Sequence, residues 1–168
     1  SGLGKTHLLH AVAADILDAA YNGTGQFAAA PLKGLRALGA LYPETVQLIT
    51  RADTGINSVK DLKGKSISSG SPGSGQYQLL TDLLKVHGMS RSDVKEDLSS
   101  FTQAVDKIKD GNLHATLITA GVPTAAVTDF AQSHALKVIA LAGPEIAELQ
   151  KQQPYYASVP LPANTYKG

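Results

Sequence analysis

Residues 63–88, KGKSISSGSPGSGQYQLLTDLLKVHG, change from one type of secondary structure to another within a few residues. The pattern predicts a strand over Ser66 to Ser69, followed by a loop of glycine, serine and proline over Gly70 to Gly75. Gln76 to His87 then carries its leucines on one helix face, and Gly88 follows as a stop signal. A strand, a loop and a helix in this order predict one unit of an α/β fold.

The same alternation continues on both sides of this unit. The pattern predicts further helices over Ala11–Ala20, Val59–Leu62, Phe101–Lys109, Pro123–Ser133 and Pro144–Gln152, and further strands over Val46–Thr50, Ala115–Ile118 and Lys137–Leu141. After Pro154 the pattern predicts irregular structure, because three prolines occur by Pro162. Strands that alternate with helices in this way predict a parallel-rich sheet flanked by helices, in an α/β fold.

Composition narrows the class of protein. The chain has 168 residues, of which 43% are hydrophobic and 17% charged, so we expect an ordered core in one domain or two small lobes. Its net charge of +1 argues against binding to nucleic acid or to a membrane surface. The absence of cysteine excludes disulfides, thiol catalysis and zinc–thiolate sites. No apolar stretch is long enough to insert into a bilayer and no secretory signal begins the chain, so we expect a cytosolic, mature or truncated form.

The first residues contain a partial phosphate-binding motif. Ser1 to His10 resembles the P-loop of bacterial replication-initiator ATPases, and Gly4-Lys5-Thr6 matches the end of that motif. The first glycine of the motif would fall before Ser1, and no later stretch has the pattern of a Walker B strand. We therefore expect residues 1–13 to be an unrelated or misjoined leader, with nucleotide binding through Gly4-Lys5-Thr6 as an alternative.

Two loops between a strand and a helix are candidate ligand sites. The first contains Ser71, Gly73, Ser74 and Gly75, and it opens a helix whose free N–H groups suit an anion. The second runs from Thr119 through Gly121 to Thr124, and ligands of open α/β sheets bind outside the carboxyl ends of the strands. The five histidines are scattered, so we expect no catalytic set, no metal site and no cofactor.

A series of loop strings recurs along the chain in a recognisable order: Tyr21-Asn22-Gly23-Thr24-Gly25, Pro31 to Arg36, Leu41 to Gln47, Arg51 to Ile56, Asp61 to Lys65, Gly70 to Gly75, Thr119 to Thr124 and Pro162 to Gly168. Read in this order, the strings resemble the TAXI-family solute-binding proteins of TRAP transporters. The similarity covers about Ala14 to Gly168.

The resemblance implies a non-enzymatic periplasmic or extracytoplasmic receptor, built as a lobe of the type II periplasmic-binding-protein kind with its second lobe incomplete. Residues 14–52 would be a remnant of lobe one and residues 53–168 would be lobe two. The receptor would bind a small organic anion such as glutamate or 2-oxoglutarate and deliver it to TRAP membrane permease subunits. The residues expected to bind the ligand are Tyr21, Asn22, Tyr42, Ser71, Gly73, Ser74, Gly75, Thr119 and Gly121. An inactive structural fragment is the remaining alternative.

Overall fold

A computed structural model describes residues 5–9, 12–36 and 44–166 of the chain. The strands are β1 (Lys5–Leu9), β2 (Thr45–Arg51), β3 (Ser66–Ser68), β4 (Lys95–Asp97), β5 (Ala115–Ala120), β6 (Leu136–Ile139) and β7 (Ala157–Leu161). The α-helices are α1 (Val12–Asn22), α2 (Gly75–Val86), α3 (Phe101–Lys109), α4 (Ala125–Ser133) and α5 (Pro144–Gln152). Short 3-10 helices are η1 (Gly25–Phe27), η2 (Ala52–Thr54), η3 (Val59–Leu62) and η4 (Arg91–Asp93).

Helix starts follow local capping chemistry. Helix α3 begins after Ser100, which forms a capping box with Gln103. Helix α5 has Pro144 in its first turn. Backbone N–H groups there have no partner within the helix, so proline removes no helical hydrogen bond. The bounds predicted for α3 and α5 are confirmed residue for residue.

The α/β fold is confirmed, but the sheet is mixed, so the expectation of a parallel-rich sheet is wrong. Its strand order is β4-β3-β5-β2-β1-β7, and β6 pairs with β2 off this path. Strand β3 is parallel to β4 and β5, whereas β2 is antiparallel to β1, β5 and β6, and β1 is antiparallel to β7. The period-two pattern of a strand does not encode its direction, and the central strand β2 runs against its neighbours.

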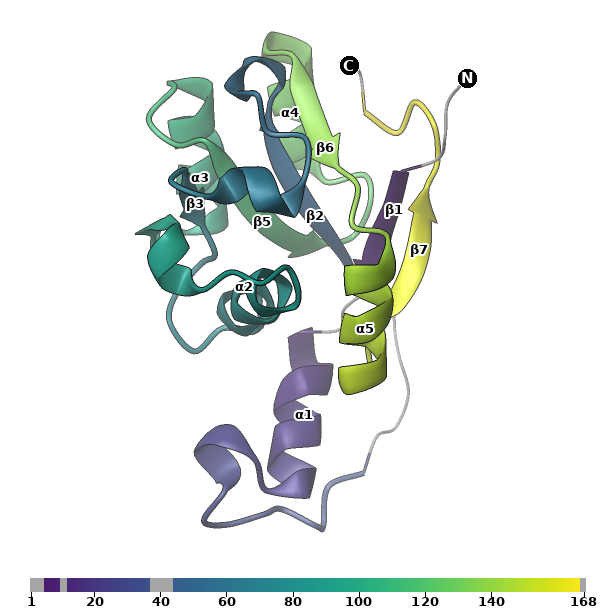
Figure 1. The fold of residues 1–168 in the computed structure, drawn as a ribbon. Coiled ribbons are helices and arrows are strands. Elements are labelled where there is room, and N and C mark those ends of the chain that lie inside the picture. The colour runs from purple at the N-terminus through teal and green to yellow at the C-terminus, as the bar shows by residue number, and fades with distance from the viewer. Residues whose placement is uncertain (1–4, 10–11, 37–43, 167–168) are drawn as a thin grey trace.

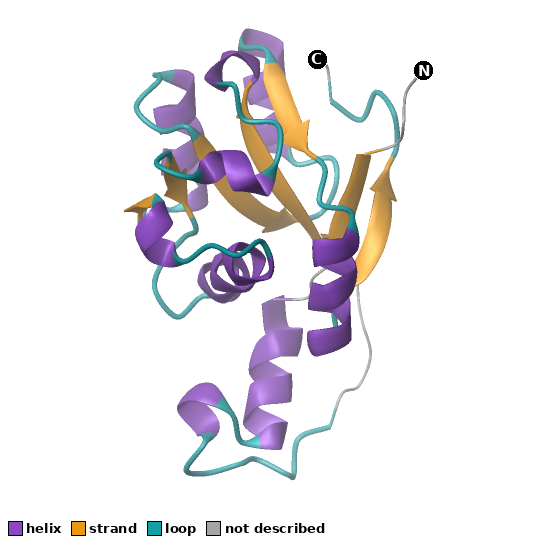
Figure 2. Ribbon diagram, viewed as in Figure 1, coloured by secondary structure: helices purple, strands orange, loops and turns teal. Residues whose placement is uncertain are grey.

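Helices cover both faces of this sheet (Figures 1 and 2). Strand β2 alternates between the faces, with Val46 and Leu48 in the core under α2, α5 and η3, and Ile49 in the core under α3 and α4. Phe130 is fully buried in the second core. Helix α1 and η1 extend away from the lower end of the sheet in Figure 1, and α1 contacts α2.

One expectation for the chain ends is wrong, and the nucleotide-binding alternative at the other end is not supported. The segment after Pro154 forms strand β7, which tolerates Pro160 because it lies at an edge of the sheet. Lys5 and Thr6 lie in strand β1, in register with Leu161 and Pro160 of β7. A P-loop places its lysine and threonine at the start of a helix, so the described part of this segment does not form one.

Candidate ligand-binding pocket

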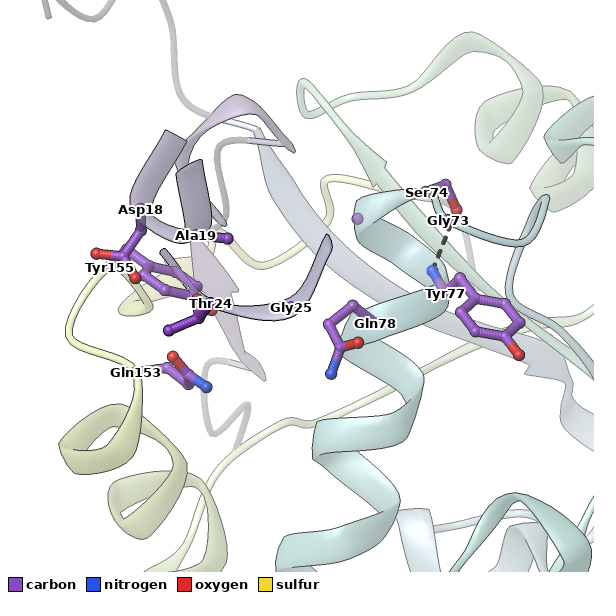
Figure 3. Close-up of a pocket in the computed structure, with 11 residues that line it drawn as sticks. Asp18, Ala19, Thr24, Gly25, Gly73, Ser74, Tyr77, Gln78, Gln153 and Tyr155 are labelled. Carbon is purple, nitrogen blue, oxygen red and sulfur yellow. Dashed lines mark hydrogen bonds between the residues drawn. The ribbon is translucent and has the colours of Figure 1, made fainter. Parts of the chain in front are cut away.

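A cavity of about 350 Å³ lies where the end of α1, the start of α2 and the segment after α5 meet (Figure 3). Its lining residues come from segments that are far apart in the sequence: Asp18, Ala19, Thr24, Gly25, Gly73, Ser74, Gly75, Tyr77, Gln78, Gln153 and Tyr155. The cavity therefore joins the Tyr21–Gly25 string to the Ser71–Gly75 string, which are the two most specific strings of the sequence resemblance.

The amino end of α2 contributes hydrogen-bond donors to this cavity. Ser74 caps the helix, because its Oγ accepts the N–H of Tyr77 at 3.2 Å, and its own N–H donates to the carbonyl of Ser71 at 3.1 Å. The N–H and the Oγ of Ser74 therefore already have partners in the loop and in the first turn of α2. The next two N–H groups of the helix have no partner within it; they belong to Gly75, which lines the cavity, and to Gln76, which does not. These amides, with the positive end of the helix dipole, can bind an anion.

The loop before α2 has a backbone shape that requires glycine. Gly70 has φ +76° and Gly73 has φ +81°, in the left-handed region that favours this residue. A Cβ at Gly70 would lie 2.9 Å from Oε1 of Gln76, whose Nε2 donates to the carbonyl of Leu117 at 3.4 Å. Gln76 thereby connects the start of α2 to strand β5.

Arg91 holds the first turns of α2, and the sequence pattern did not single it out. Its guanidinium lies 3.6 Å from the centre of the Tyr77 ring and donates to the Tyr77 carbonyl at 2.9 Å and to Oγ1 of Thr81 at 2.8 Å. It also forms an ion pair with Glu96, which accepts a hydrogen bond from Oγ of Ser69 at 3.0 Å. Burial lowers the pKa of this guanidinium below its ordinary value. Arg91 therefore connects α2, η4 and the loop after β3 into one unit.

The opposite wall carries a carboxylate, an amide and a phenol. In Figure 3, Asp18 and Tyr155 lie next to each other, with Thr24 and Gln153 close by, across the cavity from Gly73 and Ser74. Oδ1 of Asp18 accepts a hydrogen bond from Nδ2 of Asn22 at 2.9 Å. Asp18 is the one charged side chain among the lining residues, and none of them is lysine or arginine.

The structure brings together some of the predicted site residues and not others. Gly73, Ser74 and Gly75 line the cavity. Ser71 is exposed and supplies a carbonyl to the turn. Tyr21 lines a neighbouring groove with Leu17, Leu35, Arg36 and Pro154. Asn22 does not line the cavity but donates a hydrogen bond to Asp18, which does. The pocket residues Asp18, Gln153 and Tyr155 were not predicted, and the one available signal was the Tyr155-Tyr156 pair in a chain with 5% aromatic residues.

The second predicted loop lies outside the cavity lining. Thr119 pairs with Val46 near the end of β5, and its buried Oγ1 has no hydrogen-bond partner among the described residues. The carbonyl of Gly121 accepts from Oγ1 of Thr124 at 2.7 Å. Tyr42 and Gly4 fall outside the described residues. In the part of the chain that the structure describes, no group of acidic or histidine side chains has the arrangement of a metal site.

A model of the NMT1-like family matches residues 5–168. The chain belongs to this family. The matched range of this NMT1-like chain includes residues 5–13, which belong to the segment that we expected to be an unrelated leader. Among residues 5–9, 12–36 and 44–166, no helix is long and apolar enough to cross a membrane.

Solved structures similar to the NMT1-like chain include periplasmic proteins. The periplasmic aliphatic sulphonate binding protein SsuA from Escherichia coli is 15% identical, with a TM-score of 0.48, over 71% of this chain and 59% of that chain. The second substrate binding domain of a putative amino acid ABC transporter from Streptococcus pneumoniae is 19% identical, with a TM-score of 0.42, over 69% and 59%. The L-cystine solute receptor of Neisseria gonorrhoeae is 16% identical, with a TM-score of 0.40, over 60% and 38%. The NMT1-like chain thus spans less than two thirds of the length of these relatives.

Proposed function

We propose that this chain is the ligand-binding lobe of an extracytoplasmic solute receptor, which captures a small organic carboxylate for a TRAP-type membrane permease. One observation carries the proposal. The last residues of the two strings that resemble the TAXI family, Thr24 and Gly25 of the first and Gly73 to Gly75 of the second, line one cavity at the amino end of α2. The TRAP permease and the carboxylate come to the proposal from this resemblance.

The chemistry of the cavity supports an oxyanion as ligand. The N–H groups of Gly75 and Gln76 are donors that the helix itself leaves unused, and the helix dipole adds a partial positive charge at the same place. The volume of about 350 Å³ is at the lower end of the range for small-molecule sites. A carboxylate of a few carbon atoms suits a site of this size and polarity.

The proposal keeps the second loop and the division into lobes. Residues 14–52 would belong to lobe one and residues 53–168 to lobe two, with β2 of the first range paired to β5 and β6 of the second in the same sheet, and Tyr42 and Tyr21 would lie on the lobe-one side of the ligand. Thr119, whose buried Oγ1 has no described hydrogen-bond partner, would reach a ligand only if the end of β5 rearranged on binding. Gly121 would allow the ligand to approach the backbone closely.

Binding can be tested by calorimetry and thermal shift of the 168-residue chain with glutamate, 2-oxoglutarate, other small carboxylates and a small sulfonate. A carboxylate present at about 100 times its dissociation constant should add about 2.7 kcal/mol to the free energy of unfolding. No shift with any carboxylate would contradict the proposal and favour the inactive structural fragment. A shift with the sulfonate alone would contradict the carboxylate part of the proposal.

A pair of variants at one position tests the role of the helix amides. Gly75→Pro removes one N–H at the first position of α2, where proline is compatible with the helix, and Ser74 already has the extended backbone that precedes proline. Gly75→Ala adds a side chain but keeps the N–H. Loss of a hydrogen bond to a charged group should weaken affinity about 10- to 100-fold in Gly75→Pro and far less in Gly75→Ala. Equal affinities of the two variants would contradict the proposed contact.

A further inference from the structure

We infer that Arg91 is a positioning residue of the proposed ligand site: it holds both ends of the Gly70–Ser74 loop in place and so raises the affinity for an anion that it does not contact. The inference rests on the proposed function and adds a determinant of affinity to it. It is carried by the contacts of one guanidinium, which binds both Ser69, just before the loop, and Tyr77, in the first turn of α2 just after it. Arg91 itself lies outside the described lining of the cavity.

The guanidinium of Arg91 uses all five of its N–H donors within the protein. Nη1 donates to the carbonyl of Tyr77 at 2.9 Å and to Oγ1 of Thr81 at 2.8 Å. Nη2 donates to Oγ of Ser69 at 3.3 Å and forms the ion pair with Glu96, and Nε donates to the other carboxylate oxygen of Glu96 at 3.3 Å. One planar group therefore joins the start of α2 to β4 and to the residue after β3.

The backbone that carries Arg91 is itself held in place. Ser90 and Asp93 form a capping box across η4, in which Oδ2 of Asp93 accepts hydrogen bonds from the N–H and the Oγ of Ser90, each at 2.9 Å. The carbonyl of Asp93 accepts the N–H of Gly64 at 2.7 Å, which connects η4 to the segment that leads into β3. Arg91 thus presents its donors from a fixed base, which a residue that positions others requires.

The loop needs such a restraint because of its glycines. Gly70 and Gly73 lie in the left-handed region, and glycine loses more conformational freedom on ordering than any other residue. A loop that is loose in the free chain must be ordered when a ligand binds, and the cost of this ordering lowers the affinity. Because Arg91 anchors both ends of the loop beforehand, the N–H of Gly75 is in place before a ligand arrives.

Two other roles for Arg91 lead to different results in the same experiments. A purely structural role would change the stability of the chain but not its affinity for a ligand. A long-range attraction between the guanidinium and an anion would depend on charge alone, which lysine keeps and which the carboxylate of Glu96 opposes. Variants at these two positions therefore separate the three roles.

Calorimetry of the 168-residue chain with glutamate and with 2-oxoglutarate tests the inference. Arg91→Lys keeps the charge but loses the planar fork, so the affinity for whichever of the two binds the wild-type chain should fall about fivefold. Glu96→Gln removes the ion pair that orients the guanidinium, so affinity should fall in this variant as well. Attraction by charge alone predicts instead no change in Arg91→Lys and tighter binding in Glu96→Gln.

Ile108→Val is the matched control for stability. Ile108 is fully buried in the core under α3 and α4, on the other face of the sheet, so the loss of one methyl group should lower the free energy of unfolding without changing affinity. Affinities are compared at a temperature at which circular dichroism shows every variant to be folded.

The failure of the inference and the failure of the proposed function give different results. Equal affinity of Arg91→Lys and wild type, or tighter binding by Glu96→Gln, would overturn the inference and leave the proposed carboxylate receptor in place. A loss of affinity in Ile108→Val as large as that in Arg91→Lys would overturn it too. Failure of both carboxylates to bind the wild-type chain would overturn the inference and the proposed function together.

Discussion

Replacement of Ser74 by alanine separates the helix cap from the proposed ligand contact. Alanine keeps the N–H that donates to Ser71 and removes the Oγ that accepts the N–H of Tyr77 at 3.2 Å. Loss of one such cap costs about 1 kcal/mol of the free energy of unfolding. In a domain of this size the change should lower Tm by about 2–4 °C. Because the N–H groups of Gly75 and Gln76 remain, the ligand keeps its proposed donors.

The cap energy also sets a limit on the loss of affinity. If ligand binding had to re-form the helix start that the lost cap no longer holds, the free energy of carboxylate binding would weaken by about 1 kcal/mol. The dissociation constant would then rise about fivefold. Urea unfolding followed by circular dichroism measures the stability change. With a slope of about 2 kcal/mol per molar, the midpoint should move by about 0.5 M while the slope stays constant.

Ser100→Ala is the matched control for this experiment, since Ser100 caps α3 through a capping box and does not line the cavity. It should lose a similar amount of stability without any loss of affinity. An unchanged midpoint in Ser74→Ala would refute the assignment of the cap. A loss of affinity well above fivefold would refute the view that the amides, rather than the Ser74 hydroxyl, hold the ligand.

Three more predictions follow from contacts away from the ligand. Burial lowers the pKa of His114 below its ordinary 6.5, and its Nδ1 accepts a backbone N–H. The unfolded chain therefore binds more protons than the folded chain just below pH 6.5, so the free energy of unfolding should fall as the pH drops from 6.5. Urea titrations at several pH values should show this slope, and His114→Gln should flatten it. Arg91→Lys should lower the free energy of unfolding by about 1–3 kcal/mol, because lysine cannot both stack on Tyr77 and donate in two directions, and an unchanged urea midpoint would contradict this. Leu83→Ala should cost about 2–5 kcal/mol because Leu83 is 1% exposed, whereas Leu98→Ala, at a position that is 50% exposed, should cost less than about 0.5 kcal/mol in the same assay.

Local signals predicted the helices well and the sheet less well. The start of α5 carries a first-turn proline, which acts within a few residues and can be recognised in the sequence. The start of α3 was predicted from a capping serine, but the pattern favoured Ser99, and the serine that caps the helix is Ser100. Strand β7 was missed because Pro160 argues against a strand, and only its position at the sheet edge makes that proline acceptable. The antiparallel direction of β2 depends on how distant segments pair, which no local pattern records.

The candidate pocket shows the same division between local and distant information. The Ser71–Gly75 loop could be found because glycine and serine before a helix have a direct physical meaning at an anion site. Asp18 and Tyr155 could not be found, since each has an ordinary local setting and becomes part of a site only when α1 and the segment after α5 meet. The composition of the pocket lining therefore depends on tertiary structure.

An amide-resolved NMR titration of the 168-residue chain with glutamate and with 2-oxoglutarate tests the central claim most directly, because it reports where the ligand binds. The account predicts saturable shifts of the backbone resonances of Gly25, Gly73 and Gly75, which line the cavity and need no mutation to be observed. A separate groove should not respond in the same range of concentration; it is lined by Asp97, Leu98, Ser99, Gln103, Asp106, Lys107 and Asp110. Saturable shifts confined to that groove, or no shifts at the three glycines in the presence of any of the carboxylates named above, would contradict the account.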